Sequence, residues 1–322
     1  MSAQLLDGTA IAAAIRAEVG RDLAALAAQG VHPRLAVVLV GHDPASEVYV
    51  RNKVRACGEL GIGSERLLPS AHSTTEELLA IVERLNADPE VDGILVQLPL
   101  PPQVDAQRVL LAVSPSKDVD GFHPVSMGNL VTGRPGLTPC TPTGVIEILK
   151  RSQIEIAGKE AVVVGRSDIV GKPQALLLLR ENATVTICHS RTRDLAAVCR
   201  RADILIAAIG RPALLGAEHI KPGAVVIDVG MNRLTDAAEV ARYFPGDVGR
   251  REGLAKRGGT LIGDVDPRAA WERAAAFTPV PGGVGPLTIA MLMVNTVKAA
   301  RNRRGLALAA ELLAPGRVGR PC

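Results

Sequence analysis

The sequence predicts an α/β protein with two parallel-sheet domains, the second of them Rossmann-like, and a cleft between them. At ~150 residues per domain, the 322 residues of the chain make two domains of ordinary size. Segments with helical spacing alternate with short apolar runs along the whole chain, which is typical of β/α units. Several runs are apolar on both faces, as a buried parallel sheet requires.

The composition excludes several classes of protein. Phe, Tyr and Trp together make up only 2% of the chain, so it lacks the aromatic platforms that stack nucleic-acid bases or sugars. The 37 basic and 33 acidic residues are interspersed, which argues against a nucleic-acid stripe or a polybasic membrane anchor. The five cysteines form no C-x-x-C pair, and neither a signal peptide nor an apolar run of ~18 residues is present. We expect a cytoplasmic protein that binds neither nucleic acid nor membrane.

The first domain is expected over residues 1–139, with a return helix within 284–322. Apolar residues recur at helical spacing over 8–30, and a β-branched strand follows at 35–40. Asp43 is a predicted N-cap, with Pro44 in the first turn of a helix that extends to about residue 60. The other expected elements are strands at 67–68 and 93–97 and a helix that starts at Ser73.

The second domain is expected over residues 140–283 and starts with a helix near Cys140. A charged, glycine-containing segment at about 235–258 predicts an insertion into this domain. A final apolar helix at 287–300 is expected to return to the first domain. The predicted strands of this second sheet lie at 161–164, 184–188, 204–208, 225–229 and 260–262.

The segment VVVGRSDIVGKP places Gly165 at the end of a strand and Gly171 at the start of a helix. This context is typical of a dinucleotide site, because a tight turn brings the backbone close to a pyrophosphate and the helix N-terminus attracts its charge. The spacing departs from G-x-G-x-x-G, so a turn that needs its glycines only for geometry is the alternative.

The end of the next strand indicates which dinucleotide is bound. His189, Ser190 and Arg191 stand where an NAD site usually has a carboxylate. A hydroxyl together with the guanidinium groups of Arg166 and Arg191 can bind a 2′-phosphate through charge-assisted hydrogen bonds. The sequence therefore favours NADP, with solvated surface arginines as the alternative.

Four residues are candidates for a substrate site. Tyr49 and Lys53 lie one turn apart on one helix face, and a lysine in a suitable environment transfers protons while a tyrosine covers a flat ligand. Gln97, in DGILVQLPLP, ends a buried strand at the edge where open parallel sheets place active sites. Asp120, in KDVDGFHP, can accept two parallel hydrogen bonds from an amino-pyrimidinone edge, the head group of pterins. A solvated lysine and a turn aspartate are the alternatives.

Eight motifs occur in order along nearly the whole chain. They are Tyr49-x-x-x-Lys53, DGILVQLPLP, KDVDGFHP, PCTPTG, VVGRSDIVGKP, DVGMN, GDVD and TPVPGGVGPLT. Together they resemble the bifunctional methylenetetrahydrofolate dehydrogenase/cyclohydrolase family.

The resemblance implies NADP-dependent oxidation of 5,10-methylene-tetrahydrofolate to 5,10-methenyl-tetrahydrofolate, then hydrolysis to 10-formyl-tetrahydrofolate, with one bound folate and no metal. It implies that Lys53 transfers protons and that Gln97 holds it, that Tyr49 packs on the folate, and that Asp120 anchors the pterin. The implied cofactor contacts are Gly165, Arg166, Ser167, Ser190 and Met231. The implied folate contacts also include Pro281, Gly282 and Gly283, in a turn expected to shape the wall of the cleft.

The resemblance also implies a homodimer joined through the cofactor domain. Two features depart from the family pattern: a longer segment between DVGMN and GDVD, and an extension beyond Arg304. Both bear on the dimer geometry and on the cofactor contacts near Met231. Two other functions remain open from the residues alone, namely a different NADP-dependent two-domain dehydrogenase of small hydroxy or keto acids, and a non-catalytic NADP-binding protein.

Overall fold

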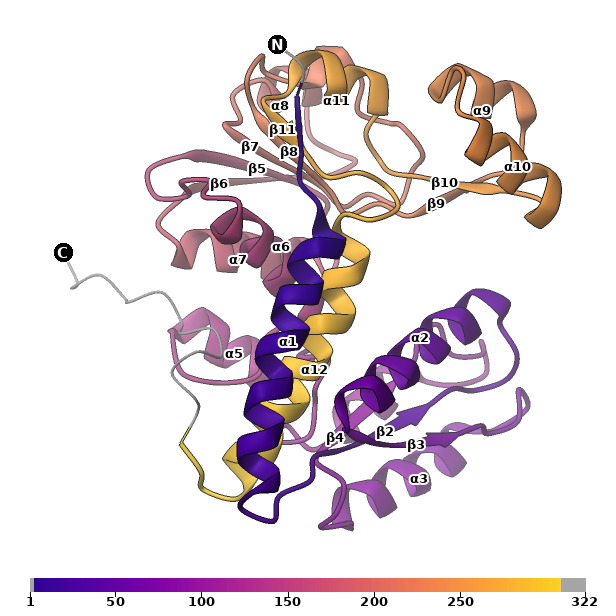
Figure 1. Cartoon of the computed structure of the whole chain (residues 1–322), viewed down its shortest axis with the longest axis vertical. Coiled ribbons are helices and arrows are strands. Elements are labelled where there is room, and N and C mark those ends of the chain that lie inside the picture. The colour runs from indigo at the N-terminus through magenta and orange to yellow at the C-terminus, as the bar shows by residue number, and fades with distance from the viewer. Residues whose placement is uncertain (1–2, 308–322) are drawn as a thin grey trace. The chain divides into compact units, whose positions relative to one another are not determined.

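A computed structural model describes residues 3–307 and divides them into two compact units (Figure 1). The three-stranded unit comprises Ala12–Cys140 and the chain from Ile289 onward. The six-stranded unit comprises the chain up to Ile11 and Thr141–Thr288. Each unit is built around its own parallel sheet, so the predicted α/β class with two parallel sheets is confirmed. None of the helices within residues 3–307 is long and apolar enough to cross a membrane.

The sheet of the three-stranded unit is parallel, in the order β3-β2-β4. From the central strand β2 the chain passes to β3 on one side and then crosses to β4 on the other. The carboxyl ends of β2 and β4 therefore adjoin a topological switch point, which is where open α/β sheets bind ligands. The elements of this unit are α1 (Gly8–Ala27), β2 (Arg34–Val38), α2 (Pro44–Leu60), β3 (Gly63–Leu67), α3 (Thr75–Ala87), β4 (Gly93–Val96), α4 (Ala106–Ala112), α5 (Pro124–Thr132) and α12 (Val284–Arg303), although α1 and α12 each begin within the residues of the other unit.

Local sequence determines where α2 and α3 begin. The carboxylate of Asp43 accepts a hydrogen bond from the Ser46 amide at 2.8 Å, which caps α2 as predicted. Thr74 and Glu77 form a capping box at α3, one residue later than the expected start at Ser73. These caps satisfy helix amides that have no partner inside the helix.

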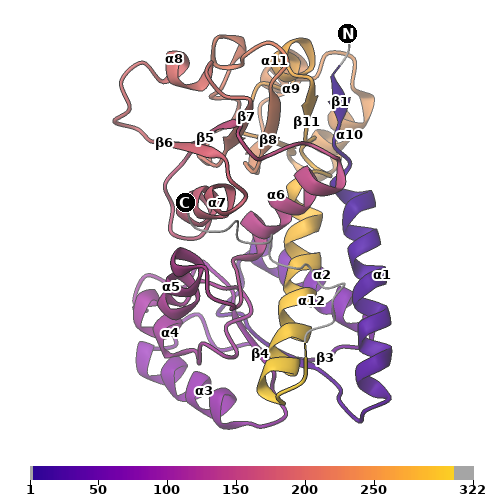
Figure 2. The same ribbon diagram turned by 90° about the vertical axis from the view of Figure 1, so that its left-hand side faces the viewer.

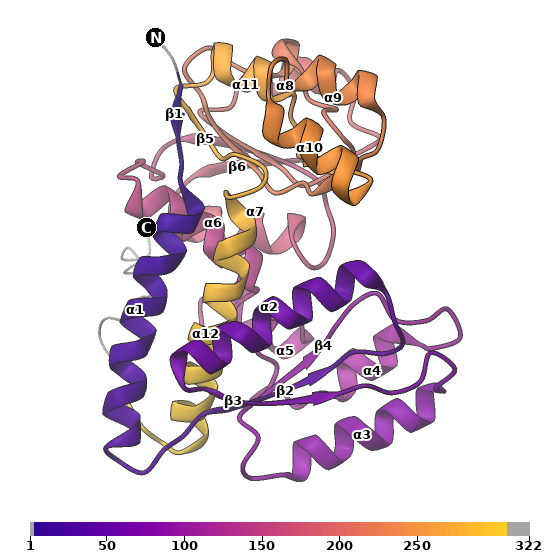
Figure 3. The same cartoon turned by 45° about the vertical axis from the view of Figure 1, so that its right-hand side comes forward.

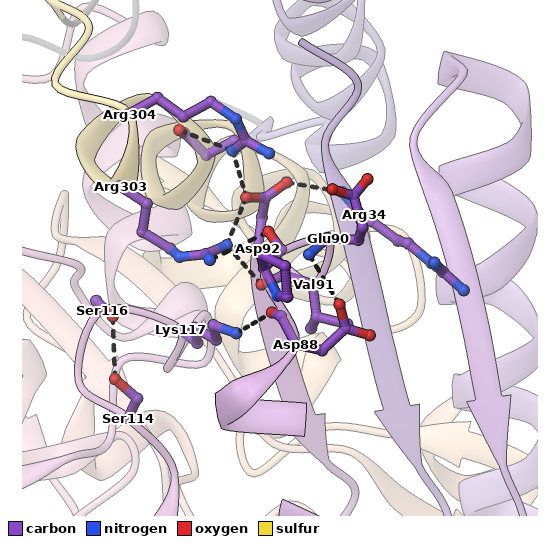
Figure 4. A network of polar contacts seen from close by, with 12 residues as sticks. Arg34, Asp88, Glu90, Val91, Asp92, Ser114, Ser116, Lys117, Arg303 and Arg304 are labelled. Carbon is purple, nitrogen blue, oxygen red and sulfur yellow. Dashed lines mark hydrogen bonds and ion pairs between the residues drawn. The ribbon is translucent and has the colours of Figure 1, made fainter. Parts of the chain in front are cut away.

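The end of α12 is fastened to the three-stranded unit by buried ion pairs. Asp92, fully buried before β4, accepts hydrogen bonds from Arg303 at 2.7 Å, from Arg304, and from the backbone amide of Arg34 at 3.1 Å (Figure 4). Arg301 pairs with Asp22 of α1, and α1 and α12 lie side by side (Figure 2). Because removing one partner of a buried pair leaves an uncompensated charge, these contacts fix the register of α12. The rest of the predicted return segment, 308–322, lies outside the described residues.

The sheet of the six-stranded unit is parallel throughout, in the order β1-β11-β8-β7-β5-β6. Composition and periodicity predict that residues 1–139 form one domain, but β1 pairs with β11 and so brings the N-terminus into this second sheet. The elements are β1 (Gln4–Leu5), α6 (Cys140–Arg151), β5 (Glu160–Val164), α7 (Gly171–Arg180), β6 (Thr184–Cys188), α8 (Leu195–Cys199), β7 (Ile204–Ala207), η1 (Ala217–His219), β8 (Val225–Asp228), α11 (Pro267–Arg273) and β11 (Ala276–Phe277).

The predicted insertion forms a structure of its own. Strands β9 (Asn232–Leu234) and β10 (Thr260–Ile262) pair antiparallel (Figure 1). Between them the chain forms α9 (Ala237–Tyr243) and α10 (Val248–Arg257), which Figure 3 labels. The prediction that 260–262 is a strand of the parallel sheet is therefore wrong. Its partner is the strand directly before the insertion, and Leu234, Val240 and Ile262 bury a small core of their own.

Candidate active site

Lys53 and Gln97 meet at the carboxyl end of the three-stranded sheet. Lys53 lies on α2, which follows β2, and Gln97 directly follows β4. The Lys53 side-chain nitrogen Nζ donates to Gln97 Oε1 at 3.0 Å, and only 7% of Lys53 is exposed. Gln97 Nε2 donates to the carbonyl of Leu98 at 2.8 Å, so the amide presents its oxygen to the lysine. The alternative of a solvated lysine is thereby excluded.

Tyr49 lies one turn before Lys53 on α2 and is half-buried. Burial raises the pKa of its phenol, which keeps the side chain neutral at physiological pH. A neutral ring beside a buried lysine provides an apolar face with a polar tip.

Most polar residues of the KDVDGFHP loop maintain the shape of that loop. Lys117 Nζ donates to the carbonyls of Leu85, Asn86 and Asp88 at 2.6 to 2.9 Å, which satisfies the C-terminal end of α3 (the contact with Asp88 is drawn in Figure 4). Asp118 accepts hydrogen bonds from the amides of Gly121 and His123 and from the hydroxyl of Ser126. These residues are structural.

Asp120 differs from its neighbours in this loop. Among the described residues, no hydrogen bond engages its carboxylate, which is half-buried. Burial raises its pKa to about 6, with the positive charge of Lys53 opposing the rise and the negative charge of Asp118 adding to it. Lys53 is thus near enough to Asp120 to influence its ionisation, and the Asp120 oxygens are available to a ligand.

Asn295 and Cys140, to which sequence reasoning assigned no role in the site, hold the backbone next to Asp120. Asn295 of α12 donates through Nδ2 to the carbonyls of Val119 and Thr138, both at 2.8 Å. The buried thiol of Cys140 donates to the carbonyl of Val119 at 3.3 Å, and burial together with the charge of Asp120 raises the pKa of this thiol. An asparagine directly after the apolar run 289–294 is the signal that could have identified Asn295.

A second candidate site lies at the carboxyl end of β5, where the six-stranded sheet has its own switch point between β5 and β7. Gly165 follows β5 with φ of 137°, and a Cβ there would overlap the Ala208 carbonyl. Ser167 Oγ accepts from the amides of Val170 at 3.2 Å and Gly171 at 3.3 Å, at the N-terminus of α7. A turn that begins with glycine and leads into a helix N-terminus fits a dinucleotide phosphate.

The other predicted cofactor residues, Arg166, Ser190, Arg191 and Met231, are exposed, and the first three lie near this turn. Arg166 lies on the turn after β5, and Ser190 and Arg191 follow β6, which pairs with β5. Met231 follows β8 and is 43% exposed. The structure thus places the first three at the carboxyl ends of two adjacent strands, whereas Met231 lies two strands farther along the sheet.

The buried carboxylates of Asp228 and Asp264 link the DVGMN and GDVD motifs through hydrogen bonds. Asp228 accepts hydrogen bonds from the amides of Gly230, Asp264 and Val265, at 2.8 to 2.9 Å. Asp264 accepts in turn from the amides of the loop that follows β7, residues 209–211, at 2.5 to 3.0 Å. Burial raises the pKa of Asp228 to about 7. Both residues therefore organise the loops at this edge of the sheet.

The turn Pro281-Gly282-Gly283 precedes α12 and follows a cis peptide bond between Val280 and Pro281. The Gly282 carbonyl accepts a hydrogen bond from the Thr9 amide at 3.1 Å, at the start of α1. This turn is therefore attached to the N-terminal segment of its own unit.

The described cysteines, Cys57, Cys140, Cys188 and Cys199, are buried free thiols. Within residues 3–307, no group of three or more His, Cys, Asp or Glu side chains is placed to bind a metal ion. Cys322 lies outside the described residues.

Comparisons with known proteins agree with this geometry. The family described as tetrahydrofolate dehydrogenase/cyclohydrolase matches with its catalytic domain over residues 6–120 and with its NAD(P)-binding domain over 139–304. The chain is 62% identical over 305 residues to the bifunctional protein FolD of Koribacter versatilis, covering 95% of this chain and 99% of that protein. It is 54% identical to FolD 2 of Geobacter sulfurreducens, covering 93% and 97%.

Solved structures give the same result. A bifunctional FolD from Campylobacter jejuni matches with a TM-score of 0.84 and 44% identity, over 93% of this chain and 99% of that one. The Trypanosoma brucei methylenetetrahydrofolate dehydrogenase-cyclohydrolase, complexed with NADP and an inhibitor, matches with a TM-score of 0.84 and 40% identity, over 94% and 98%.

Proposed function

This chain belongs to the tetrahydrofolate dehydrogenase/cyclohydrolase family, and we propose that it oxidises 5,10-methylene-tetrahydrofolate with NADP⁺ and hydrolyses the 5,10-methenyl product to 10-formyl-tetrahydrofolate. The observation that carries this proposal is the buried Lys53–Gln97 hydrogen bond beside the unengaged carboxylate of Asp120. A proton-transfer group and a pterin anchor thus occur in one site.

Asp120 anchors the pterin in this proposal. Its ionised carboxylate can accept two parallel hydrogen bonds from the amino-pyrimidinone edge. Tyr49, one turn before Lys53 on α2, packs on the folate. Because the Asp120 oxygens make no hydrogen bond within the described part of the chain, binding the pterin does not require breaking one.

Lys53 transfers the proton in hydrolysis. Water adds to the methenyl carbon as the Lys53 amine takes a proton from it, and the same group returns a proton to N5 when the bond between N5 and that carbon breaks. Gln97 is a positioning residue, because its oxygen holds Nζ through the 3.0 Å bond. The hydroxyl of the adduct loses its own proton to solvent as the C=O bond forms, so the net reaction adds one water to the methenyl cation, leaves the formyl group on N10 and releases one proton.

The residues around Gly165 fit NADP⁺, which supplies the hydride acceptor for the oxidation. The turn formed by Gly165, Arg166 and Ser167 would hold the pyrophosphate, because it leads into the N-terminus of α7. Arg166, Ser190 and Arg191 are exposed at the ends of β5 and β6, where a 2′-phosphate would meet a hydroxyl and two guanidinium groups. Met231 contributes a further apolar contact.

Paired assays of the purified full-length chain test this function. We expect NADP⁺ reduction that depends on 5,10-methylene-tetrahydrofolate, and loss of 5,10-methenyl-tetrahydrofolate hydrolysis in Lys53→Met. Arg55→Met changes an exposed base on the same helix and should retain both activities. If NADP⁺ reduction does not exceed background, the proposal fails. If Asp120→Ala retains full activity, a dehydrogenase of small hydroxy or keto acids is the better assignment.

We further propose that the enzyme is a cytoplasmic homodimer joined through the six-stranded unit, without nucleic-acid partners. Edge strand β6 and helix α7 expose Ile187 and Leu179, which are 43% and 60% accessible. Exposed apolar side chains at a sheet edge favour pairing with a second copy. The buried free thiols suit a reducing compartment. Light scattering should give twice the 33.7 kDa mass of the chain, and a monomer would contradict the proposal.

A further inference from the structure

The loop that follows β7, residues 209–211, is held by a single buried carboxylate. Asp264 is completely buried, and its Oδ2 accepts hydrogen bonds from the amides of Ile209 at 2.5 Å and Gly210 at 3.0 Å. Its Oδ1 accepts from the amide of Arg211 and from Nδ2 of Asn232, both at 2.9 Å. Four N–H groups thus surround one carboxylate, and hydrogen bonds to a carboxylate are stronger than those to a neutral acceptor.

The conformation of this β7 loop also depends on a glycine. Gly210 has a φ of 73°, in the left-handed region that residues with a Cβ rarely adopt. A Cβ at Gly210 would meet no atom within 4 Å, so the backbone conformation and not the available space requires the glycine. The loop is therefore kept in an unusual conformation, and the carboxylate of Asp264 is the group that its three amides share.

The β7 loop begins beside the proposed dinucleotide turn. The Ala208 amide donates to the Val164 carbonyl at 2.8 Å, so β5 and β7 remain paired up to the residue before Gly165. A Cβ at Gly165 would overlap the Ala208 carbonyl, which shows that the two backbones are in direct contact. The loop therefore starts next to the turn, at the switch point between β5 and β7, where open α/β sheets bind ligands.

The order of the strands indicates which half of the cofactor this loop faces. Ser190 and Arg191, which we propose for the 2′-phosphate, follow β6 on one side of β5, and the β7 loop follows the strand on the other side. A dinucleotide whose pyrophosphate lies at the Gly165 turn extends to both sides of β5. Because its adenosine half lies toward β6, its nicotinamide half lies toward the β7 loop.

We propose that Asp264 is a positioning residue that holds the β7 loop in the conformation that binds the nicotinamide half of NADP⁺. This inference rests on the proposed function, because it assumes that the dinucleotide occupies the Gly165 turn. Asp264 acts through the loop amides and does not touch the reacting atoms. Asn232 begins β9 and Asp264 follows β10, so the two strands that bound the insertion bring this pair together and connect the insertion to the cofactor site.

Binding and kinetics of Asp264→Asn in the full-length chain test this role. Asparagine has one acceptor oxygen in place of two, so we expect the dissociation constant of NADP⁺, measured by calorimetry, to rise about tenfold. Adenosine 2′,5′-bisphosphate carries only the adenosine half and should bind as it does to the wild type. The KM for NADP⁺ should rise in the oxidation, whereas hydrolysis of 5,10-methenyl-tetrahydrofolate, which needs no hydride acceptor, should keep its rate.

Asp203→Asn is the matched control. The Asp203 carboxylate also accepts a backbone amide, that of Glu160 at 3.0 Å, but it does so at the amino end of the same sheet. This variant loses an acceptor oxygen in the same unit and should bind NADP⁺ as the wild type does.

A pair of glycine variants tests the loop without altering the carboxylate. Gly210→Ala strains the left-handed backbone of the β7 loop, so NADP⁺ must restore the bound conformation, and we expect affinity to fall about fivefold. Gly223→Ala strains an equally open position, with φ of 83°, just before β8 at the amino end of the sheet. It should leave NADP⁺ binding unchanged.

The outcomes separate the inference from the proposed function. A wild type that does not bind NADP⁺ contradicts the function, whereas a wild type that binds it and an unaltered Asp264→Asn variant overturn only the role of Asp264. Should Asp264→Asn not fold, weaker NADP⁺ binding in Gly210→Ala than in Gly223→Ala supports the proposal, and equal binding overturns it. Equal losses of affinity for NADP⁺ and for adenosine 2′,5′-bisphosphate would indicate general destabilisation and overturn it.

Discussion

The side-chain oxygen of Gln97 accepts a hydrogen bond from Lys53. The orientation of this amide is fixed, because its nitrogen donates to the Leu98 carbonyl at 2.8 Å. The glutamine therefore accepts from the lysine and cannot donate to it. Gln97 therefore uses one N–H of Lys53 and leaves the rest of the amine to exchange protons with water and substrate.

Replacing Gln97 should separate the two activities. We expect Gln97→Leu to lower the kcat of hydrolysis by about a hundredfold, since a misplaced proton-transfer group loses most of its contribution. Dehydrogenation should fall less, because the oxidation does not require a proton from water. Stopped assays of both reactions on one preparation measure the ratio. Gln29→Leu, at an exposed glutamine whose side chain bonds to the Ala25 carbonyl at the end of α1, is the control, and equal losses in Gln97→Leu would contradict this role.

Folate binding should weaken in acid because of Asp120. Its pKa is raised to about 6, so the carboxylate becomes protonated as the pH falls through that value and loses one of its two acceptor oxygens. One unit below the pKa, roughly a tenth of the molecules remain ionised, which predicts about a tenfold weaker affinity at pH 5 than at pH 7. Titration calorimetry with tetrahydrofolate measures this change. Asp120→Asn should bind weakly at both pH values, and a pH-independent affinity in the wild type would refute the anchor.

A methyl group at Gly263 should destabilise the six-stranded unit. A Cβ at this position would overlap the carboxylate of Asp228, which accepts three amide hydrogen bonds and cannot move away freely. We expect Gly263→Ala to lower the free energy of unfolding by about 3 kcal/mol, as overpacked buried sites do. Gly249→Ala, in α10 with ordinary contacts, should instead be neutral or stabilising. Urea denaturation compares the two, and equal stabilities would contradict this account.

Gln174 offers the opposite case, a substitution that should stabilise. Its side chain is completely buried in α7, and neither its amide nitrogen nor its oxygen has a hydrogen-bond partner among the described residues. Replacing an unsatisfied buried amide by an apolar group of similar size recovers about 1 kcal/mol or more. Gln174→Met should therefore raise the midpoint of urea unfolding. A lower midpoint would mean that the amide has a partner in the folded protein.

Local signals were sufficient for much of the site. Asp43 and Pro44 predict the start of the helix that bears Lys53, and Gln97 is predicted because it ends a buried strand. Both residues then meet because carboxyl ends of adjacent parallel strands share one edge of the sheet. Asp120 was found by the chemistry of its loop, although sequence alone could not tell it from Asp118, whose hydrogen bonds depend on the folded loop.

Long-range pairings were not predictable in the same way. Strand β1 is two residues long and joins β11, more than 270 positions away, so neither propensity nor periodicity identifies it. The partner of β10 was mistaken because an apolar run indicates a strand but not its neighbour. Arg250 lies in a charged segment typical of a surface, and only the folded chain brings it to Val280.

Asn295 imposes an order on the folding of the chain during its synthesis. The loop that carries Asp120 emerges early from the ribosome, but the side chain that bonds to Val119 and Thr138 is added more than 150 residues later. The six-stranded unit contains no residue after Thr288, so it can finish folding while the Asp120 loop still lacks its support. The proposed pterin anchor is therefore completed last, when α12 leaves the ribosome, and a chain that terminates before Asn295 would have its Gly165 turn but an unsupported Asp120.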